Sequence, residues 1–474
     1  MLANIDKFLG TVDDLVWGVP LIVIILATGI YLTLRLGGLQ VRHLGKALKF
    51  MVRNEEDGVG EVTSFGALCT ALSATIGTGN IVGVASAIAA GGPGALFWME
   101  VAAFFGMATK YAEGLLAVKY RTMDESGHVL GGPFYYIEKG MGKGWTWLAK
   151  LFAVFGALAG LLGIGTITQI NGITSAAQNF FDPNKAHVVF SIGSGDSATA
   201  ITLTTVIVGL LVTLFVALVV IGGIQRIAKV SEIIVPFMAI IYVVCGLLIL
   251  ICNVTSIPAA IYQIVVGAFK PQAVAGGIVG VTIKLAMQKG IARGIFSNEA
   301  GLGSAPIAAA AAQTKEPVRQ GLVTMTGTFI DTIIICTITG LSIVLTGAWD
   351  PDLGLEGAEI TMYAFQNALP FPAQVGSFLL MLCLMFFAFT TILGWDYYAE
   401  RCLEYLSGGK MGPVKVYRWL YIIAVFVGPY LTVSAVWTIA DIFNGLMAFP
   451  NLIALLALSG VVAKETKDYF ARHK

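Results

Sequence analysis

The sequence predicts an all-α, polytopic membrane protein, and three observations lead to that prediction. Of the 474 residues, 57% are hydrophobic and only 12% are charged, whereas soluble domains carry about 25% charged residues. Several stretches are apolar over the roughly 20 residues that a membrane-spanning helix needs. Glycine is abundant, with 56 residues, and small residues let helices pack closely in a membrane. The net charge of +1 gives no support to nucleic-acid binding.

Apolar stretches follow one another along the whole chain, which we interpret as a single domain covering residues 1–474. Eleven spans are predicted, at 15–36, 62–91, 95–119, 148–181, 199–222, 229–253, 273–312, 321–347, 374–407, 415–436 and 438–463. The first is kept as a true span because the N-terminus lacks a basic segment and a small-residue cleavage site. The seventh is predicted to form two half-helices, since it contains a glycine-rich polar patch. Its cations Lys284, Lys289 and Arg293 are not explained by the sequence.

Lysine and arginine are concentrated in alternate loops, which indicates the orientation in the membrane. If the N-terminus is outside, the outside segments contain only Lys7, Lys185 and Lys270. Most of the 29 basic residues then lie inside, and the acidic loop 350–359 lies outside. This pattern predicts a plasma-membrane protein with an outside N-terminus and a cytoplasmic C-terminus.

The second predicted span has an unusual centre, GTGNIVG from Gly77 to Gly83. Glycine inside a helix costs about 1 kcal/mol relative to alanine, so this helix is weakest at its middle. An unwound segment exposes main-chain N–H and C=O groups that lipid cannot bind. These groups then need protein partners or a polar ligand, which points to a binding site.

A second small-residue patch, SNEAGLGSAP from Ser297 to Pro306, lies in the seventh span. With residues 15–36 set aside as an extra N-terminal helix, ten core helices remain, and the two patches fall in the first and sixth. This arrangement predicts two five-helix repeats of inverted topology, 62–253 and 273–463, each with a broken first helix. Paired interruptions of this kind are typical of the binding site of a secondary transporter.

Four motifs also resemble those of the alanine or glycine:cation symporter family. They are TALSATIGTGNIVGV from Thr70, GGPGALFWM from Gly91, GGPFYYIEKG from Gly131 and ARGIFSNEAGLGSAPIAAAAA from Ala292. The resemblance covers nearly the whole chain. It implies a sodium-coupled importer of small neutral amino acids, alanine or glycine, with the five-plus-five fold of the bacterial leucine transporter.

The candidate substrate residues lie around the two interruptions. A substrate carboxylate is expected at the N–H groups of Thr78 and Gly79, because a helix N-terminus attracts anions. The ammonium group is expected at main-chain carbonyls after the first half of the sixth core helix, and Phe296 is expected to wall the pocket. The candidates are Thr75, Thr78, Gly79, Asn80, Gln169, Asn171, Ile295, Phe296 and Asn298. The resemblance implies that the third core helix lines the site, through either Gln169 or Asn171.

Sodium prefers oxygen ligands, and two sources of oxygen are expected. The carbonyls freed at the first interruption belong to Ser73, Ala74, Ile76 and Gly77, and the hydroxyls of Thr390 and Thr391 lie in the eighth core helix. The resemblance implies that sodium bridges these two helices. In the alternative interpretation, the two threonines only bond back to carbonyls of their own helix.

Other functions find less support in the sequence. A channel needs rings of repeated filter residues, and an enzyme needs a catalytic motif; neither pattern is present. Proton coupling is the alternative to sodium, with Glu299 or Asp331 as carrier. Glu299 is alternatively expected to pair with Arg293. The predicted partners are therefore an amino acid, sodium and the lipid bilayer, without nucleic acid or an obligate protein partner.

Overall fold

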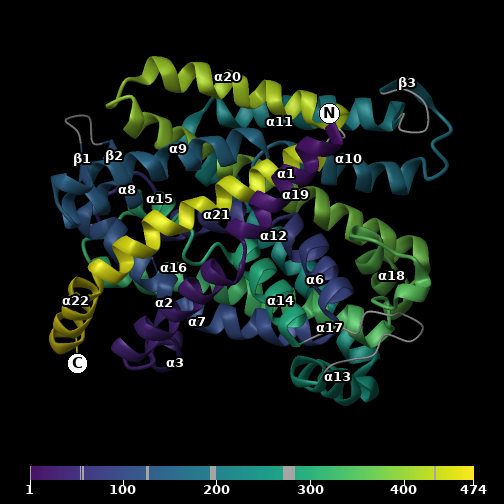
Figure 1. Cartoon of the computed structure of the whole chain (residues 1–474), viewed down its shortest axis with the longest axis horizontal. Coiled ribbons are helices and arrows are strands. Elements are labelled where there is room, and N and C mark those ends of the chain that lie inside the picture. The colour runs from purple at the N-terminus through teal and green to yellow at the C-terminus, as the bar shows by residue number, and fades with distance from the viewer. Residues whose placement is uncertain are drawn as a thin grey trace.

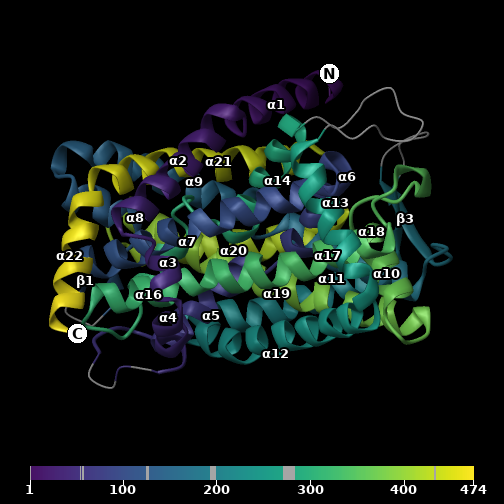
Figure 2. The same cartoon turned by 90° about the horizontal axis from the view of Figure 1, so that it is seen from below.

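The computed structural model describes residues 2–53, 55, 58–123, 128–192, 199–270, 283–431 and 434–473. They form a helical bundle whose long helices run roughly along its longest axis (Figure 1). One end, the α22 end, carries α22 (Ser459–Arg472) and the hairpin of β1 (Thr122–Met123) and β2 (Val129–Leu130). The opposite end, the α18 end, carries α18 (Ala358–Ala368) and the hairpin of β3 (Val188–Ile192) and β4 (Thr199–Thr202) (Figure 2).

Nine helical segments of the described chain are long and apolar enough to cross a membrane. The first three are Lys7–Arg35 within α1 (Leu2–Val16) and α2 (Val19–Arg35), α7 (Gly94–Tyr120), and Lys143–Phe181, which contains α9 (Thr146–Leu162) and α10 (Ile167–Phe181). The next three are α11 (Leu203–Val220), α12 (Gly223–Cys252), and Pro317–Thr346, which contains α16 (Pro317–Thr328), η6 (Phe329–Cys336) and α17 (Thr337–Thr346). The last three are α19 (Ala373–Leu406), Met411–Tyr430, which contains α20 (Met411–Val427), and Thr438–Ala457 in α21 (Ser434–Ala457). A tenth is the bent pair formed by α5 (Ser64–Thr75) with η1 (Gly79–Gly83) and α6 (Val84–Gly91).

These ten segments coincide with ten of the eleven predicted spans, so the protein is a multi-pass membrane protein. The remaining stretch, 273–312, contains α14 (Ile283–Asn298) and α15 (Ala305–Ala310), which are separate helices. Neither is long enough to count as a span, and residues 271–282 lie outside the described part. The structure therefore supports nine or ten spans where the sequence predicted eleven.

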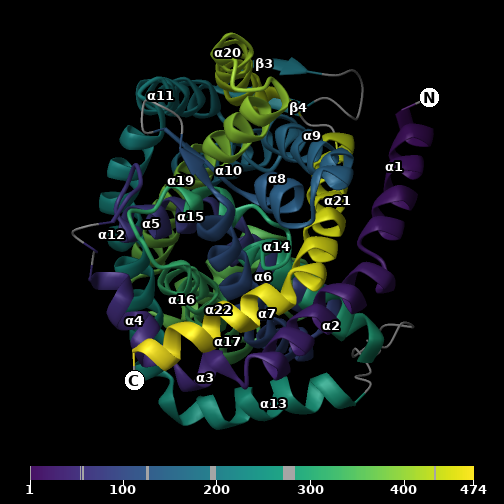
Figure 3. The same cartoon turned by 90° about the vertical axis from the view of Figure 1, so that its left-hand side faces the viewer.

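Several short helices were not predicted, because their apolar stretches are brief or amphipathic. They are α3 (Leu39–Arg42), α4 (Leu44–Val52), α8 (Pro133–Tyr135), α13 (Ile257–Phe269), α18 and α22, with single turns of other helix types at η2 (Tyr136–Gly140), η3 (Lys143–Trp145), η5 (Val254–Ser256), η7 (Pro351–Leu353) and η8 (Gly428–Tyr430). Most of them connect or cover the ends of the spans. The helix α1 lies at the periphery beside α21 (Figure 3). There the indole of Trp17 donates to the carbonyl oxygen of Asp441 at 2.9 Å.

Main-chain contacts join the start of the first core helix to the end of the sixth at the α22 end. Val62 and Ala312 form a parallel β-bridge, and the N–H of Gln313 donates to the carbonyl of Val62 at 2.7 Å. The guanidinium of Arg121, just after α7, forms hydrogen bonds to the same two segments. It donates at 2.6–2.7 Å to four main-chain carbonyl oxygens, those of Val59, Ala310, Ala312 and Thr314.

His128 makes a second connection at the α22 end, which we call the histidine clasp. Its Nδ1 lies 2.6 Å from Oε1 of Glu61, just before α5, and its Nε2 lies 2.8 Å from Oε1 of Glu404 in α19. Arg401 contacts His128 and pairs with Glu404 at 2.6 Å. The hydrogen bonds to Glu404 and Glu61 raise the pKa of His128 from 6.5 to about 9. The clasp therefore holds α5 and α19 together while His128 is protonated.

This clasp predicts a pH-dependent stability. Because the pKa of His128 is higher in the folded protein, its contribution is complete below pH 6.5 and is lost as the pH rises through about 9. We expect the melting temperature of the purified protein to fall more steeply between these values in the wild type than in His128→Gln. His187→Gln, at the exposed α18 end, is the control and should keep the wild-type slope. Equal slopes for His128→Gln and the wild type would contradict the assignment.

Candidate binding site at the interrupted helices

The first predicted interruption is present in the structure. α5 ends at Thr75, the helix resumes as a π-helical turn at Gly79, and the two parts are bent by 52°. The N–H of Gly77 donates to Oδ1 of Asn80 at 2.9 Å, and the N–H of Thr78 donates to Oε1 of Gln169 at 3.4 Å. The first N–H groups of a helix have no acceptor inside that helix. Two side-chain amides therefore bind N–H groups that the interruption frees.

Asp331 connects both interrupted segments. Asn80 donates through Nδ2 to Oδ1 of Asp331 at 2.8 Å and to its main-chain oxygen at 3.1 Å. Ser297, near the end of α14, donates to Oδ2 at 2.9 Å, and Thr332 donates to the same atom at 2.8 Å. The Asp331 side chain is fully buried within the π-helical η6. The three contacts to the side chain, from Asn80, Ser297 and Thr332, all use the carboxylate as an acceptor.

The second interruption lies between α14 and α15. Glu299 has a φ of 56° and Gly301 a φ of 90°, conformations that end the helix. The N–H of Gly301 donates to Oε1 of Glu113 at 3.1 Å, and the same carboxylate oxygen accepts from Nδ2 of Asn451 at 2.7 Å. α7 and α21 thus supply the polar groups that this irregular segment needs at membrane depth.

The expected pairing of Glu299 with Arg293 is wrong. Glu299 instead accepts a hydrogen bond from Ser304 within its own interruption. Arg293 pairs with Asp441 of α21 at 4.0 Å, and its guanidinium lies 5.5 Å from the ring centre of Phe296. Arg293 lies within α14, whereas Glu299 follows the last residue of α14 and has a φ of 56°, so helical spacing does not bring the two side chains together.

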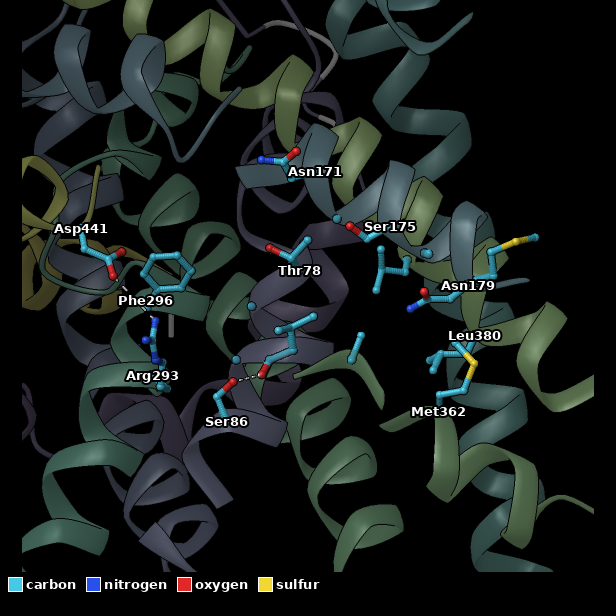
Figure 4. Close-up of a pocket in the computed structure, with 18 of the residues that line it drawn as sticks. Thr78, Ser86, Asn171, Ser175, Asn179, Arg293, Phe296, Met362, Leu380 and Asp441 are labelled. Carbon is cyan, nitrogen blue, oxygen red and sulfur yellow. Dashed lines mark hydrogen bonds and ion pairs between the residues drawn. The ribbon is translucent and has the colours of Figure 1, made fainter. Parts of the chain in front are cut away.

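A cavity of about 560 Å³ reaches the first interruption (Figure 4). Four predicted substrate residues line it, namely Thr78, Gly79, Asn171 and Phe296. The ring of Phe296 lies against Gly79, where a β-carbon would be 3.4 Å from Cδ1 of the ring. Ala358 and Met362 of α18 also line the cavity, which places it toward the α18 end.

Five predicted substrate residues do not line this cavity: Thr75, Asn80, Gln169, Ile295 and Asn298. Their side chains stabilise the surrounding segments. Asn80 and Gln169 bind the freed N–H groups, as described above. Asn298 donates to Oγ1 of Thr332 at 3.0 Å and accepts from the N–H of Ala300 at 2.9 Å. Thr75 bonds back within α5, 3.2 Å from the carbonyl oxygen of Ala71.

One cation that the sequence left unexplained, Arg293, lines the cavity together with two carboxylates. Arg293 and Asp441 lie on one side of it, and Asp13 of α1 joins them. In Figure 4, Phe296 lies between Asp441 and Thr78. Polar residues missed by sequence analysis also line the cavity: Ser86, Ser175 and Asn179. Ser175 and Asn179 follow Asn171 at intervals of four, a helical spacing that indicates a shared polar face.

The two threonines of α19 have different surroundings. The Thr391 hydroxyl lies 3.3 Å from the carbonyl oxygen of Ile76 and 2.9 Å from that of Phe387. The Thr390 hydroxyl bonds back to Phe387 at 3.0 Å and approaches the sulfur of Met238 in α12. The structure thus brings Thr391, and not Thr390, to the first interruption.

Glycines allow α5 and α19 to approach closely at this point. A β-carbon at Gly394 would lie 2.7 Å from both the main-chain nitrogen of Ala74 and Oγ of Ser73. A β-carbon at Gly77 would lie 2.5 Å from the Thr391 hydroxyl. The four residues predicted to supply carbonyls, Ser73, Ala74, Ile76 and Gly77, are therefore next to α19. The Ser73 hydroxyl itself donates to the carbonyl of Thr70 at 2.7 Å.

Interrupted helices in a polytopic bundle, with a cavity that ends on them, define a secondary transporter. The particular family follows from comparison with known proteins. A family model described as the sodium:alanine symporter family matches residues 2–474. The chain belongs to this family of sodium-coupled amino-acid symporters, so it is a transporter and not an enzyme.

Three relatives illustrate the similarity. The sodium/alanine symporter AgcS of Methanococcus maripaludis is 47% identical over 472 residues, which cover 98% of this chain and 97% of that protein. An uncharacterized transporter of Haemophilus influenzae is 54% identical over 99% of this chain and 97% of its own length. The probable sodium/glutamine symporter GlnT of Bacillus subtilis is 37% identical over 99% of this chain and 92% of its own length.

The connection through Asp331 predicts a large effect of its removal. Asp331→Ala would remove the carboxylate that accepts from Ser297 and from one N–H of Asn80, at a cost of about 1–3 kcal/mol for each lost partner. We expect this variant to have a clearly lower melting temperature in detergent. Asp331→Asn keeps one acceptor oxygen, so its melting temperature should lie between those of Asp331→Ala and the wild type.

Asp352→Ala is the control for this experiment, because Asp352 is exposed in η7 at the α18 end. Its melting temperature should equal that of the wild type. If the melting temperature of Asp331→Ala equalled that of this control, Asp331 would not hold the two segments together.

Proposed function

We propose that the protein imports a small neutral amino acid, alanine or glycine, together with sodium across the plasma membrane by alternating access. The observation that carries the proposal is the cavity that ends on Thr78 and Gly79 at the interruption of a membrane helix. Similarity to the sodium/alanine symporter AgcS, at 47% identity, favours alanine over the glutamine of the less similar GlnT.

The substrate carboxylate would bind at the start of the helix formed by η1 and α6. Gly79 is the first residue of this segment, which runs to Gly91, so its N–H points back toward the interruption. The N–H of Thr78 has only a long hydrogen bond to Gln169, at 3.4 Å. A carboxylate there would replace a weak acceptor with a charged one.

The substrate ammonium would bind main-chain carbonyls at the end of α14, near Ile295 and Phe296, with Thr75 and Asn298 as further candidates. A helix C-terminus attracts cations. The ring of Phe296 would close the side-chain pocket, because it already lies against Gly79. Asn171 is favoured over Gln169 as a polar contact, since only Asn171 lines the cavity.

Sodium would bind between α5 and α19. Thr391 would supply a hydroxyl oxygen, and Ser73, Ala74, Ile76 and Gly77 would supply main-chain carbonyls. The 3.3 Å separation between the Thr391 hydroxyl and the Ile76 carbonyl supports this site, because one cation can bind both oxygens. Thr390 would contribute less, since its hydroxyl approaches Met238.

Transport would involve rocking of the bundle that contains both interrupted segments against the remaining helices. The contacts of Arg121 and His128 close the α22 end, whereas the cavity extends toward the α18 end. If the α22 end is cytoplasmic, as the basic loops predict, this conformation is accessible from outside. The N-terminus would then lie outside and the C-terminus inside.

Uptake into proteoliposomes tests the proposed coupling. With sodium outside, we expect uptake of labelled alanine that unlabelled glycine inhibits. Replacement of sodium by N-methyl-D-glucamine at fixed pH should abolish uptake. Uptake that persists without sodium would instead support proton coupling, and currents without saturable uptake would support a channel.

The sodium site predicts different effects for the two threonines. Thr391→Val keeps the side-chain shape but removes an oxygen beside Ile76, so we expect the sodium concentration for half-maximal uptake to rise about tenfold. Thr390→Val is the matched control and should change this concentration much less. Measurement of alanine uptake against sodium concentration checks the prediction. A larger effect of Thr390→Val would place the ion elsewhere.

A further inference from the structure

A second cavity, of about 760 Å³, lies at the α22 end between α22 and the segment that follows α2. We call it the basic groove, because its charged lining residues are basic. These lining residues are Arg35, Arg42, His43, Lys46, Lys467 and His473. They come from parts of the chain more than 400 positions apart, so the fold itself assembles the groove.

The arginines and lysines of this groove have no carboxylate partner within ion-pair distance in the described part of the chain. The residues that line it include no carboxylate, and the ion pairs of the described residues involve none of Arg35, Arg42, Lys46 or Lys467. Within the described ranges, Arg35 donates to two neutral hydroxyls, those of Tyr31 and Ser459. A concave surface with one sign of charge attracts a ligand of the opposite sign.

Aromatic contacts hold part of the groove in place. The ring of His43 stacks on Phe470 of α22 with ring centres 4.0 Å apart. The ammonium of Lys46 lies 4.9 Å from the ring centre of the same phenylalanine. Burial, together with the neighbouring charges of Arg42 and Lys46, lowers the pKa of His43. Lys46 and the ring of His43 are therefore held against α22 before any ligand binds.

The position of the groove relative to the membrane identifies the class of ligand. Arg35 is the last residue of the first spanning segment. Its neighbour Leu34 is 76% exposed, and Val41, beside Arg42, is 66% exposed. Exposed aliphatic side chains at the end of a spanning helix face lipid chains. A ligand that has both an anionic headgroup and acyl chains matches this surface better than a soluble anion does.

We propose that the basic groove binds the phosphate headgroup of an anionic phospholipid. The phosphate would lie among Arg42, Lys46 and Lys467, and the acyl chains would pass over Leu34 and Val41. Basic pockets on the cytoplasmic side of membrane proteins bind anionic headgroups in this way. The proposal is independent of the transported substrate, since the groove is at the end opposite to the substrate cavity.

Native mass spectrometry of the full-length transporter in detergent tests this proposal. The protein is mixed with phosphatidylglycerol or phosphatidylcholine, and the bound lipid is counted. We expect the wild type to retain phosphatidylglycerol preferentially. The combined variant Arg42→Gln, Lys46→Gln and Lys467→Gln should lose this preference by roughly tenfold or more.

A control variant removes the same charge elsewhere at the same end, through Lys143→Gln, Lys150→Gln and Lys410→Gln. These three lysines are exposed and lie outside the groove. The control should keep the wild-type preference. Equal losses in both variants would mean a general attraction of basic loops for anionic lipid and would overturn the proposal, as would an unchanged groove variant. If the triple groove variant fails to fold, Arg42→Gln and Lys467→Gln, both at exposed positions, are tested singly.

Glycerol 1-phosphate, which has the headgroup chemistry without acyl chains, distinguishes a lipid from a soluble phosphate. It is added as a competitor to the complex of the wild type with phosphatidylglycerol. Retention of the lipid at millimolar competitor supports the proposal. Complete displacement at equal concentrations would show that the phosphate alone accounts for binding, and the lipid assignment would then be wrong.

Discussion

Asp331 provides one carboxylate to two chain segments that cannot complete their own hydrogen bonding. Its oxygens accept from Asn80 in the first interrupted helix and from Ser297 beside the second, at 2.8 and 2.9 Å. Groups left without partners at membrane depth cost several kcal/mol each. Asp331 therefore links the two interruptions, because movement of either one away from η6 leaves its own donor without the Asp331 oxygen that accepts from it. The cavity proposed to hold the substrate lies directly beside this connection, since Phe296 precedes Ser297 and packs against Gly79.

The sequence was sufficient to predict the membrane class, ten of the spans and the first interruption, because these follow from local composition. It could not identify which side chains meet. Thr390 and Thr391 differ by about 100° around their helix, and only the packing of α19 on α5 determines which one faces Ile76. Similarly, Arg293 of α14 pairs with Asp441 of α21, a contact between distant segments that residue spacing does not encode.

The predicted substrate residues divide for a physical reason. Thr78, Gly79, Asn171 and Phe296 reach the cavity, while Asn80, Gln169 and Asn298 bind main-chain groups that the irregular segments leave open. Sequence analysis recognises polar residues near an interruption, but it does not separate those that bind a ligand from those that replace the missing helical hydrogen bonds. The missed residues Ser175 and Asn179 belong to the same helical face as Asn171.

The single guanidinium of Arg121 has a consequence for leakage across the membrane. It binds four carbonyls in the segment before α5 and in the segment that begins at the end of α15, which meet at the α22 end and would form the closed barrier of the proposed outward-accessible conformation. Partial separation of these segments would leave an arginine and several carbonyls competing for too few partners, so intermediate openings are unfavourable. We therefore expect this barrier to open as one concerted step, which keeps the ion gradient from dissipating during the rest of the transport cycle.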